Sequence, residues 1–298
     1  MSIQATLVKT YFRKMIKRDG LAPEKLVRHL RMAFNNAPIS FPTPRGIKAR
    51  PVRMAGFMGD HVYSGKEDVT ILYIHGGAYI AGLTKTYHPL AGYLAKQLDG
   101  EVWLTRYPFA PENPYPAAVH RCLEAYQFLL DQGRDPSRIV IMGDSAGGGL
   151  TLALLLLLKD QRLPLPACAV TLSPASTCFP DQEALLKQSA TDDMLSADVI
   201  NAVIELYVPD ESRRTEPYAS PALGDFSGLP PLQILVDRGE ILYADALLVK
   251  EAAERDGVDV EMIVREGLFH VWPVFIPLVP EAKQDLRKIV RFIRGKLL

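Results

Sequence analysis

The stretch Gly143-Asp144-Ser145-Ala146-Gly147 directly follows an apolar run, residues 139–142, and has a serine at its centre. This pattern is typical of a buried strand that turns sharply into a helix, with the serine at the apex of the turn. The incoming strand and the outgoing helix nearly touch, so side chains at Gly143 and Gly147 would collide. We expect Ser145 to be a catalytic nucleophile; the alternative is a structural, glycine-rich turn.

Apolar, β-branched segments alternate with helical segments on both sides of this turn. The alternation predicts an α/β fold, in which a parallel, doubly wound sheet carries helices on both faces. Functional residues should then lie in loops at the carboxyl ends of the strands. The predicted strands cover residues 69–74, 101–106, 138–142, 167–172, 232–236 and 258–264, and the predicted helices cover residues 89–98, 117–132, 146–159, 245–256 and 281–297.

Two regions depart from the alternation and look like additions to the sheet. The N-terminal region is expected to form one or two amphipathic helices, and a later region holds a helix over residues 199–207 with Ser196 as its N-cap. Together they are expected to form a lid. The chain is therefore divided into a first cap segment (1–45), a first core segment (46–177), a second cap segment (178–215) and a second core segment (216–298).

Composition limits the classes of protein that this chain can be. It has 298 residues, 48% of them hydrophobic, and equal numbers of acidic and basic residues, so charge suggests no nucleic-acid partner. The three cysteines lack metal-ligand spacing, which favours a reducing compartment. The apolar run 150–158 is far shorter than the roughly 18–20 residues that cross a bilayer. We expect a cytoplasmic protein with no membrane span.

A serine hydroxyl needs a base to take its proton and a third group to orient that base. His270 follows a predicted strand near the C-terminus, and an acid is expected after the preceding strand, 232–236. Asp237 and Glu240 both stand there. The order serine, acid, histidine is that of α/β-hydrolases.

The loop His75-Gly76-Gly77-Ala78 follows the predicted strand 69–74 and consists largely of small residues. Such a loop can direct backbone N–H groups at a developing oxyanion, and the N–H of Ala146 would add a further donor. Asp144 is expected to stabilise a loop. Adjacent side chains diverge, so it cannot readily orient a base bonded to Ser145.

Four ordered motifs resemble those of the hormone-sensitive-lipase family of α/β-hydrolases, in its bacterial family IV carboxylesterase branch. The likeness runs from about residue 69 to the C-terminus. The motifs are the loop His75-Gly76-Gly77-Ala78-Tyr79, which resembles His-Gly-Gly-Gly-aromatic; the segment 107–117, which resembles Tyr-Arg-Leu-Ala-Pro-Glu-x-Pro-Phe-Pro-Ala; the turn 143–148; and Leu229-Pro230-Pro231 with the loop that ends at His270.

The resemblance implies an α/β-hydrolase fold with a mostly parallel, doubly wound, eight-stranded sheet, helices on both faces and a helical cap. It implies a serine carboxylesterase that cleaves short- to medium-chain acyl esters through an acyl-enzyme, with no cofactor and no metal. Relatives often form dimers through the sheet edge and the C-terminal helix, so a homodimer is possible. One alternative is hydrolysis of lactones, amides or carbamates on the same triad. Another is a non-catalytic binding protein like the plant gibberellin receptors, although those have lost the histidine that this chain keeps as His270.

The resemblance also assigns the triad. Ser145 is implied as nucleophile, His270 as base and Glu240 as orienting acid. Glu240 stands just before the pair Ile241-Leu242, where most relatives have aspartate. Glutamate is one methylene longer and still reaches the imidazole if its backbone lies slightly further back. Asp237, at the end of the strand, is the alternative acid.

The resemblance further implies that the oxyanion donors are Gly77, Ala78 and Ala146, and that His75 and Gly76 support their loop. Ala78 stands where the family has its third glycine. An alanine keeps the N–H donor, provided that the position does not need a positive φ.

Overall fold

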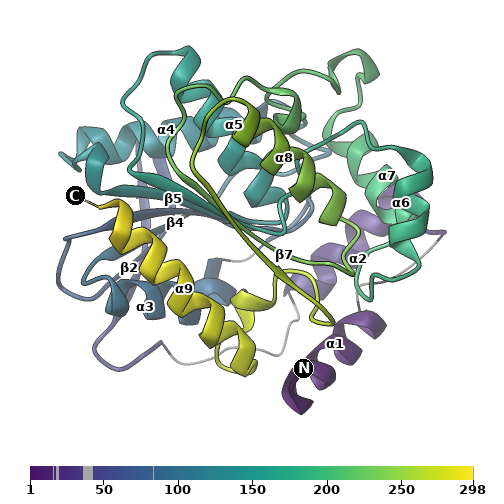
Figure 1. The fold of residues 1–298 in the computed structure, drawn as a ribbon, viewed down its shortest axis with the longest axis horizontal. Helices are drawn as coiled ribbons and strands as arrows, with labels where there is room; N and C mark the ends of the chain where they lie inside the picture. The colour runs from purple at the N-terminus through teal and green to yellow at the C-terminus, as the bar shows by residue number, and fades with distance from the viewer. Residues whose placement is uncertain (16, 18–19, 36–42, 83, 298) are drawn as a thin grey trace.

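A twisted sheet of eight strands crosses the middle of the molecule (Figure 1). The computed structural model describes residues 1–15, 17, 20–35, 43–82 and 84–297. The strands are β1 (Lys48–Met54), β2 (Phe57–Tyr63), β3 (Thr70–Ile74), β4 (Glu101–Thr105), β5 (Ile139–Asp144), β6 (Cys168–Leu172), β7 (Leu232–Asp237) and β8 (Val260–Arg265). They lie in the order β1-β2-β4-β3-β5-β6-β7-β8, and all neighbours from β4 to β8 are parallel. The predicted eight-stranded, mostly parallel sheet is confirmed.

Helices cover both faces of this sheet, as the alternation predicts. The flanking helices are α3 (His88–Gln97), α4 (Ala117–Asp131), α5 (Ala146–Asp160), α8 (Tyr243–Arg255) and α9 (Pro280–Lys296). α3 and α9 lie on one face, and α4, α5 and α8 lie on the other (Figure 1). All of β5 and residues 146–158 of α5 are buried, because a central parallel strand and the helix behind it are covered on every side.

The apolar run in α5 is part of this core. α5 has 15 residues. None of the helices within the described residues combines the length and the apolar character that spanning a bilayer demands.

β1 and β2 form an antiparallel hairpin that the strand–helix alternation does not reveal. β1 is an edge strand in which Val52 alone is buried, so it lacks an apolar pattern. β2 is mostly buried but carries polar residues. His61 bonds to Glu101 at 2.6 Å, and Asp60 bonds to His88 at 2.8 Å. These pairs satisfy polar groups that residue type alone would place at the surface.

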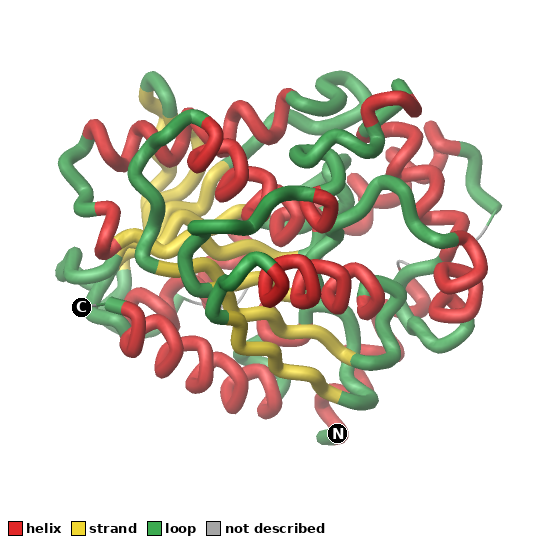
Figure 2. Tube along the Cα trace, turned by 45° about the horizontal axis from the view of Figure 1, so that its top comes forward, coloured by secondary structure: helices red, strands yellow, loops and turns green. Residues whose placement is uncertain are grey.

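The helices α1 (Ile3–Met15), α2 (Pro23–Asn35), α6 (Gln182–Ser189) and α7 (Ala197–Tyr207) gather at one end of the molecule (Figures 1 and 2). The Ser196 side chain accepts a hydrogen bond from the Val199 N–H at 3.4 Å, as expected of the N-cap of α7. The sequence pattern does not predict α6, a short and mostly polar helix whose one buried residue is Leu185. The division into cap and core segments stays a prediction, and residues 16, 18–19 and 36–42 of the first cap segment lie outside the described residues.

Candidate active site

Ser145 lies at the junction of β5 and α5 with a φ of 53° and a ψ of −123°, a conformation that costs a side-chain-bearing residue free energy. Glycines stand two residues before and two residues after it for steric reasons. A Cβ on Gly143 would lie 2.2 Å from the carbonyl oxygen of Gly147, and a Cβ on Gly147 would lie 2.0 Å from that of Ile74. The close approach thus involves β3 as well as β5. The turn lifts the Ser145 hydroxyl to a partly exposed position above the sheet.

The side chains of Ser145, His270 and Glu240 form one hydrogen-bonded chain. The His270 Nε2 is 2.9 Å from the Ser145 Oγ, and its Nδ1 is 2.7 Å from the Glu240 Oε2. Glu240 is 2% exposed and His270 5%. Burial is the largest single influence and disfavours the charged imidazolium. The hydrogen bond to Glu240 and the surrounding negative charges together outweigh it and raise the pKa of His270 above its ordinary value. The arrangement is that of a base poised to take the serine proton.

Of the two candidate acids, Glu240 contacts His270, whereas Asp237 accepts hydrogen bonds from backbone N–H groups. The Glu240 Oε1 accepts hydrogen bonds from the Ser173 Oγ at 2.9 Å and the Asp237 N–H at 2.8 Å. The Asp237 carboxylate accepts bonds from the N–H groups of Gly239 at 2.9 Å and Leu268 at 2.7 Å. Asp237 therefore fixes the turn before Glu240 and the loop before His270.

The loop after β3 turns back tightly, and its backbone is left-handed at several residues. Gly77 has a φ of 125°, Ala78 of 57° and Tyr79 of 59°. The condition for an alanine at position 78, that no positive φ be needed, is therefore not met, and Ala78 carries the strain that a glycine would avoid. Among the described residues, no acceptor pairs with the N–H groups of Gly77 and Ala78. The N–H of Ala146, the first residue of α5, also lacks an intrahelical acceptor.

Asp144 supports this loop from below, as expected. Its carboxylate accepts hydrogen bonds from the Gly76 N–H at 3.0 Å, the Tyr73 hydroxyl at 2.9 Å and the Tyr87 hydroxyl at 3.0 Å. Burial raises the pKa of Asp144 to about 6. A Cβ on Gly76 would lie 2.4 Å from this carboxylate, so the loop can approach it only through a glycine.

His75 is a neutral, structural histidine. Burial lowers its pKa to about 4, so the imidazole is uncharged at neutral pH. The Nδ1 is 2.7 Å from the Gly76 carbonyl oxygen, which makes it the N–H donor of the ring. The ring stacks on Tyr107 with centroids 4.5 Å apart, and the Tyr107 hydroxyl donates to the His75 carbonyl. These contacts hold the start of the loop.

Three residues that bond to Glu240 or Asp144 are not predicted from the sequence: Ser173, Tyr73 and Tyr87. Ser173 directly follows β6, so the rule that functional residues lie at the carboxyl ends of parallel strands could have flagged it. Tyr73 and Tyr87 carry no such signal. One lies inside an apolar strand and the other just before a helix, where a tyrosine is ordinarily a packing residue.

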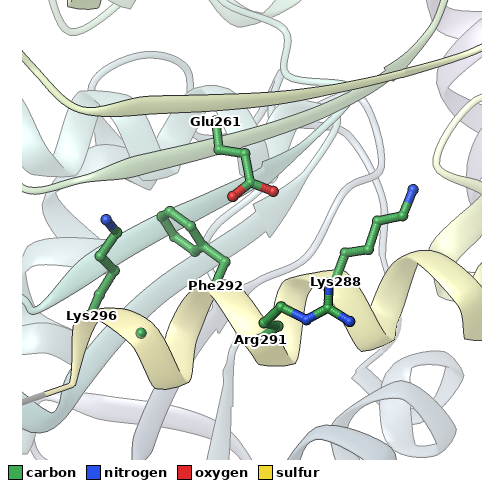
Figure 3. A pocket seen from close by; sticks show the side chains of 6 residues that line it. Glu261, Lys288, Arg291, Phe292 and Lys296 are labelled. Atoms are coloured by element: carbon green, nitrogen blue, oxygen red, sulfur yellow. The ribbon is translucent and has the colours of Figure 1, made fainter.

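A hollow of about 350 Å³ lies away from this cluster, between β8 and the second half of α9 (Figure 3). Its lining residues are Glu261, Lys288, Arg291, Phe292, Gly295 and Lys296. Glu261 is near the amino end of β8, whereas the triad residues follow the carboxyl ends of their strands. The hollow is therefore not part of the candidate active site.

This chain is similar to known proteins that are named as an esterase and an acetyl-hydrolase. A family model described as "alpha/beta hydrolase fold" matches residues 71–274. An esterase from Acinetobacter venetianus is 34% identical over 292 residues, which cover 96% of each chain. An acetyl-hydrolase from Streptomyces hygroscopicus is 36% identical over 225 residues, which cover 76% of this chain and 75% of that protein.

Two solved structures of esterases match this chain over its whole length. An esterase from the bacterial hormone-sensitive lipase family has a TM-score of 0.90 and 31% identity, covering 100% of this chain and 99% of that one. The esterase EstE5, in a crystal soaked with p-nitrophenyl butyrate, has a TM-score of 0.88 and 31% identity with the same coverage.

Proposed function

We propose that this chain, which belongs to the hormone-sensitive-lipase family of α/β-hydrolases, is a serine carboxylesterase for short- to medium-chain acyl esters. One observation carries the proposal: a continuous hydrogen-bonded chain runs from the Ser145 hydroxyl through His270 to the buried Glu240. An acyl transfer needs this set, and a loop of free backbone donors stands beside it.

In the first half of the reaction, the Ser145 Oγ attacks the ester carbonyl carbon while the His270 Nε2 takes its proton. The carbonyl oxygen becomes an oxyanion and accepts hydrogen bonds from the N–H groups of Gly77, Ala78 and Ala146. Glu240 keeps the proton of the imidazole on Nδ1 and stabilises the imidazolium that forms. His270 then gives its proton to the leaving alkoxide, the C–O bond breaks, and the acyl group stays on Ser145.

In the second half, water replaces the alcohol. His270 takes a proton from water, whose oxygen attacks the acyl carbon, and the second oxyanion meets the same backbone donors. Breakdown of this intermediate releases the carboxylic acid and returns the proton from His270 to the Ser145 Oγ. No step needs a cofactor from outside the chain.

The acyl-length preference is supported by the relatives. One is named an acetyl-hydrolase, and a similar solved esterase was soaked with a butyrate ester. We further propose that the segments 1–45 and 178–215 form a cap that limits the acyl pocket. Tyr207 of α7 stacks on Tyr79 of the oxyanion loop, and Arg31 of α2 donates to the carbonyl of Ile80 in the segment that follows. Contacts from both segments thus reach the loop that faces the acyl carbonyl.

Hydrolysis of p-nitrophenyl esters of increasing acyl length tests the proposal, with wild type and Ser145→Ala compared at equal folded concentration. Ser137→Ala, in an exposed turn, is the matched control for loss of a serine hydroxyl. We expect a maximum at short or medium chains, loss of turnover in Ser145→Ala and unchanged rates in Ser137→Ala. Full activity in Ser145→Ala would overturn the mechanism.

A fluorophosphonate label read by mass spectrometry separates the alternatives. Labelling at Ser145 without ester turnover would point to an amide, lactone or carbamate substrate. Neither labelling nor turnover would point to a binding protein.

A further inference from the structure

The turn that carries Glu240 is held from outside by residues 188–192, which run from the end of α6 towards α7. The Gln188 Nε2 donates hydrogen bonds to the carbonyl oxygens of Arg238 and Glu240, both at 3.1 Å. The Thr191 Oγ1 is 3.1 Å from the carbonyl oxygen of Gly239. The carbonyl groups of three consecutive residues, 238–240 (the acid turn), thus accept hydrogen bonds from side chains of the segment 178–215.

Asp192 completes this contact from a buried position. Asp192 is 5% exposed, and its Oδ2 accepts a hydrogen bond from the Ile241 N–H at 2.7 Å. The Oδ1 accepts bonds from the N–H groups of Met194 at 2.7 Å and Leu195 at 2.9 Å. One carboxylate therefore joins the residue after Glu240 to the chain that leads into α7.

Asp192 also adds a negative charge close to the triad. The charged groups that act on His270 are Glu240 after β7, Asp192 before α7 and Asp144 at the end of β5, and all three raise its pKa. Two lysines lie near this segment. Lys17 donates to the carbonyl of Asp192, and Lys9 pairs with the neighbouring Asp193 at 2.7 Å. The Asp192 carboxylate itself bonds to the Ile241 N–H, directly after Glu240.

We propose that Asp192 and Gln188 are positioning residues for the triad, which hold the Glu240 turn where its carboxylate meets the His270 Nδ1 and thereby couple the α6–α7 segment to catalysis. This inference rests on the proposed function, because it concerns the triad of that reaction. A displacement of about 1 Å in a catalytic group can cost as much as 10²-fold in rate. The turn would gain that freedom without these bonds.

Asp192→Asn and Asp193→Asn form a matched pair, because each removes one negative charge at adjacent positions. An asparagine at 192 keeps one acceptor oxygen, so it cannot serve both the Ile241 N–H and those of residues 194 and 195. We expect kcat to fall about tenfold with KM within twofold. We also expect the acid limb of kcat/KM to move to lower pH, because a negative charge near His270 is lost.

Asp193 faces Lys9 and Arg13 rather than the acid turn. We expect Asp193→Asn to leave both kcat and the acid limb unchanged. If Asp192→Asn matched Asp193→Asn in kcat and in its pH profile, and lowered only the melting temperature, Asp192 would be a purely structural residue and the proposal would be overturned.

A second pair of variants covers the case in which Asp192→Asn fails to fold. Gln188→Ala removes the two bonds to the acid turn, whereas Gln182→Ala, on the same helix, removes bonds to Asn201 within the cap. We expect a several-fold fall in kcat for the first variant alone. Equal kcat values in the two variants would sink the proposal. Loss of the proposed function itself gives a different result, because wild type and both control variants would then lack Ser145-dependent turnover.

Discussion

The ring of Tyr79 stacks on the ring of Tyr207, with centroids 3.7 Å apart and planes within 4° of parallel. Tyr79 belongs to the loop after β3, and Tyr207 is the last residue of α7. Both residues are buried. Stacked aromatic pairs add about 0.5–1.5 kcal/mol to the burial of their surface. The position of α7 is therefore tied to the loop that the proposed mechanism uses for the oxyanion.

We predict that Tyr207→Phe keeps this stack and does not lower stability. Within the described part of the chain, the Tyr207 hydroxyl is buried and has no hydrogen-bond partner. A buried unpaired polar group costs about 1–3 kcal/mol, so its removal should leave the free energy of unfolding equal or higher. Tyr115→Phe is the matched control and should lose about 1 kcal/mol, because that hydroxyl donates to Glu216 at 2.7 Å. Equal losses in urea titrations would show that Tyr207 has a partner in solution.

We predict that Ala78→Gly stabilises the protein by about 1 kcal/mol and leaves its esterase rate unchanged. A left-handed backbone costs a non-glycine residue about 1–2 kcal/mol, part of which is offset by the greater freedom of glycine in the unfolded chain. The N–H donor is kept. Thermal unfolding and kcat on a butyrate ester measure the two effects. Gly77→Ala is the opposite case and should abolish activity, since its Cβ would lie 1.9 Å from the carbonyl oxygen of Ala81.

The sequence predicts the central part of the fold because its signals there are local. The run 139–142, the glycines around Ser145 and the apolar α5 all lie in one strand–turn–helix unit. The hairpin of β1 and β2 escapes prediction for a physical reason: its buried Asp60 and His61 pair with residues that are distant in sequence, His88 and Glu101. No local pattern reveals such a pairing.

In the candidate site, too, the sequence predicts the parts with local signals and not those that depend on contacts between distant residues. Ser145 and the loop after β3 are readable from residue type and position, because glycines are required where backbones touch. The choice between Glu240 and Asp237 depends on where a turn points its side chains, which only the folded chain fixes. The positioning role that we propose for Asp192 is harder still to predict, because it depends on a hydrogen bond to Ile241, 49 residues away in the sequence.

We predict that activity and the stability contributed by His270 change in opposite directions above pH 6.5. The pKa of His270 is raised in the folded protein, so the pair with Glu240 stabilises the fold fully below the ordinary histidine pKa and less as pH rises through the folded value. The neutral imidazole is the base in the proposed mechanism, so we expect kcat/KM to rise over the same range. The difference in unfolding free energy between wild type and His270→Gln, measured from pH 5.5 to 9, isolates this contribution from other groups. A difference that grew with pH would contradict the prediction.

We predict that Glu240→Gln lowers kcat by about 10³–10⁴-fold, because an amide can present the wrong partner to the imidazole Nδ1–H. Asp237→Asn should instead lower the free energy of unfolding by about 1–3 kcal/mol, since its carboxylate accepts bonds from Gly239 and Leu268. Its kcat should fall by less than tenfold. Steady-state rates and urea titrations of both variants show which of the two carboxylates orients His270. The reverse ranking in kcat would make Asp237 the orienting acid.

The last prediction concerns Arg31 of α2, whose guanidinium makes two kinds of contact. It pairs with both carboxylate oxygens of Glu112 at 2.8 and 2.6 Å, and it donates to the carbonyls of Ile80 and Ala110, both at 3.1 Å. The Arg31 side chain is 33% exposed and that of Glu112 is 57% exposed. An ion pair so open to water contributes less than about 1 kcal/mol. The carbonyls, in contrast, belong to buried residues beside the loop after β3.

Arg31→Ala should therefore lower kcat several-fold and the free energy of unfolding by about 1–3 kcal/mol, because two carbonyls lose a charged donor. Glu112→Gln should change kcat by less than twofold, since the guanidinium keeps its carbonyl contacts. Arg31→Lys retains the charge with a single donor centre and should fall between the two. Equal effects of Arg31→Ala and Glu112→Gln would mean that the ion pair, and not the carbonyl contacts, attaches α2 to the loop.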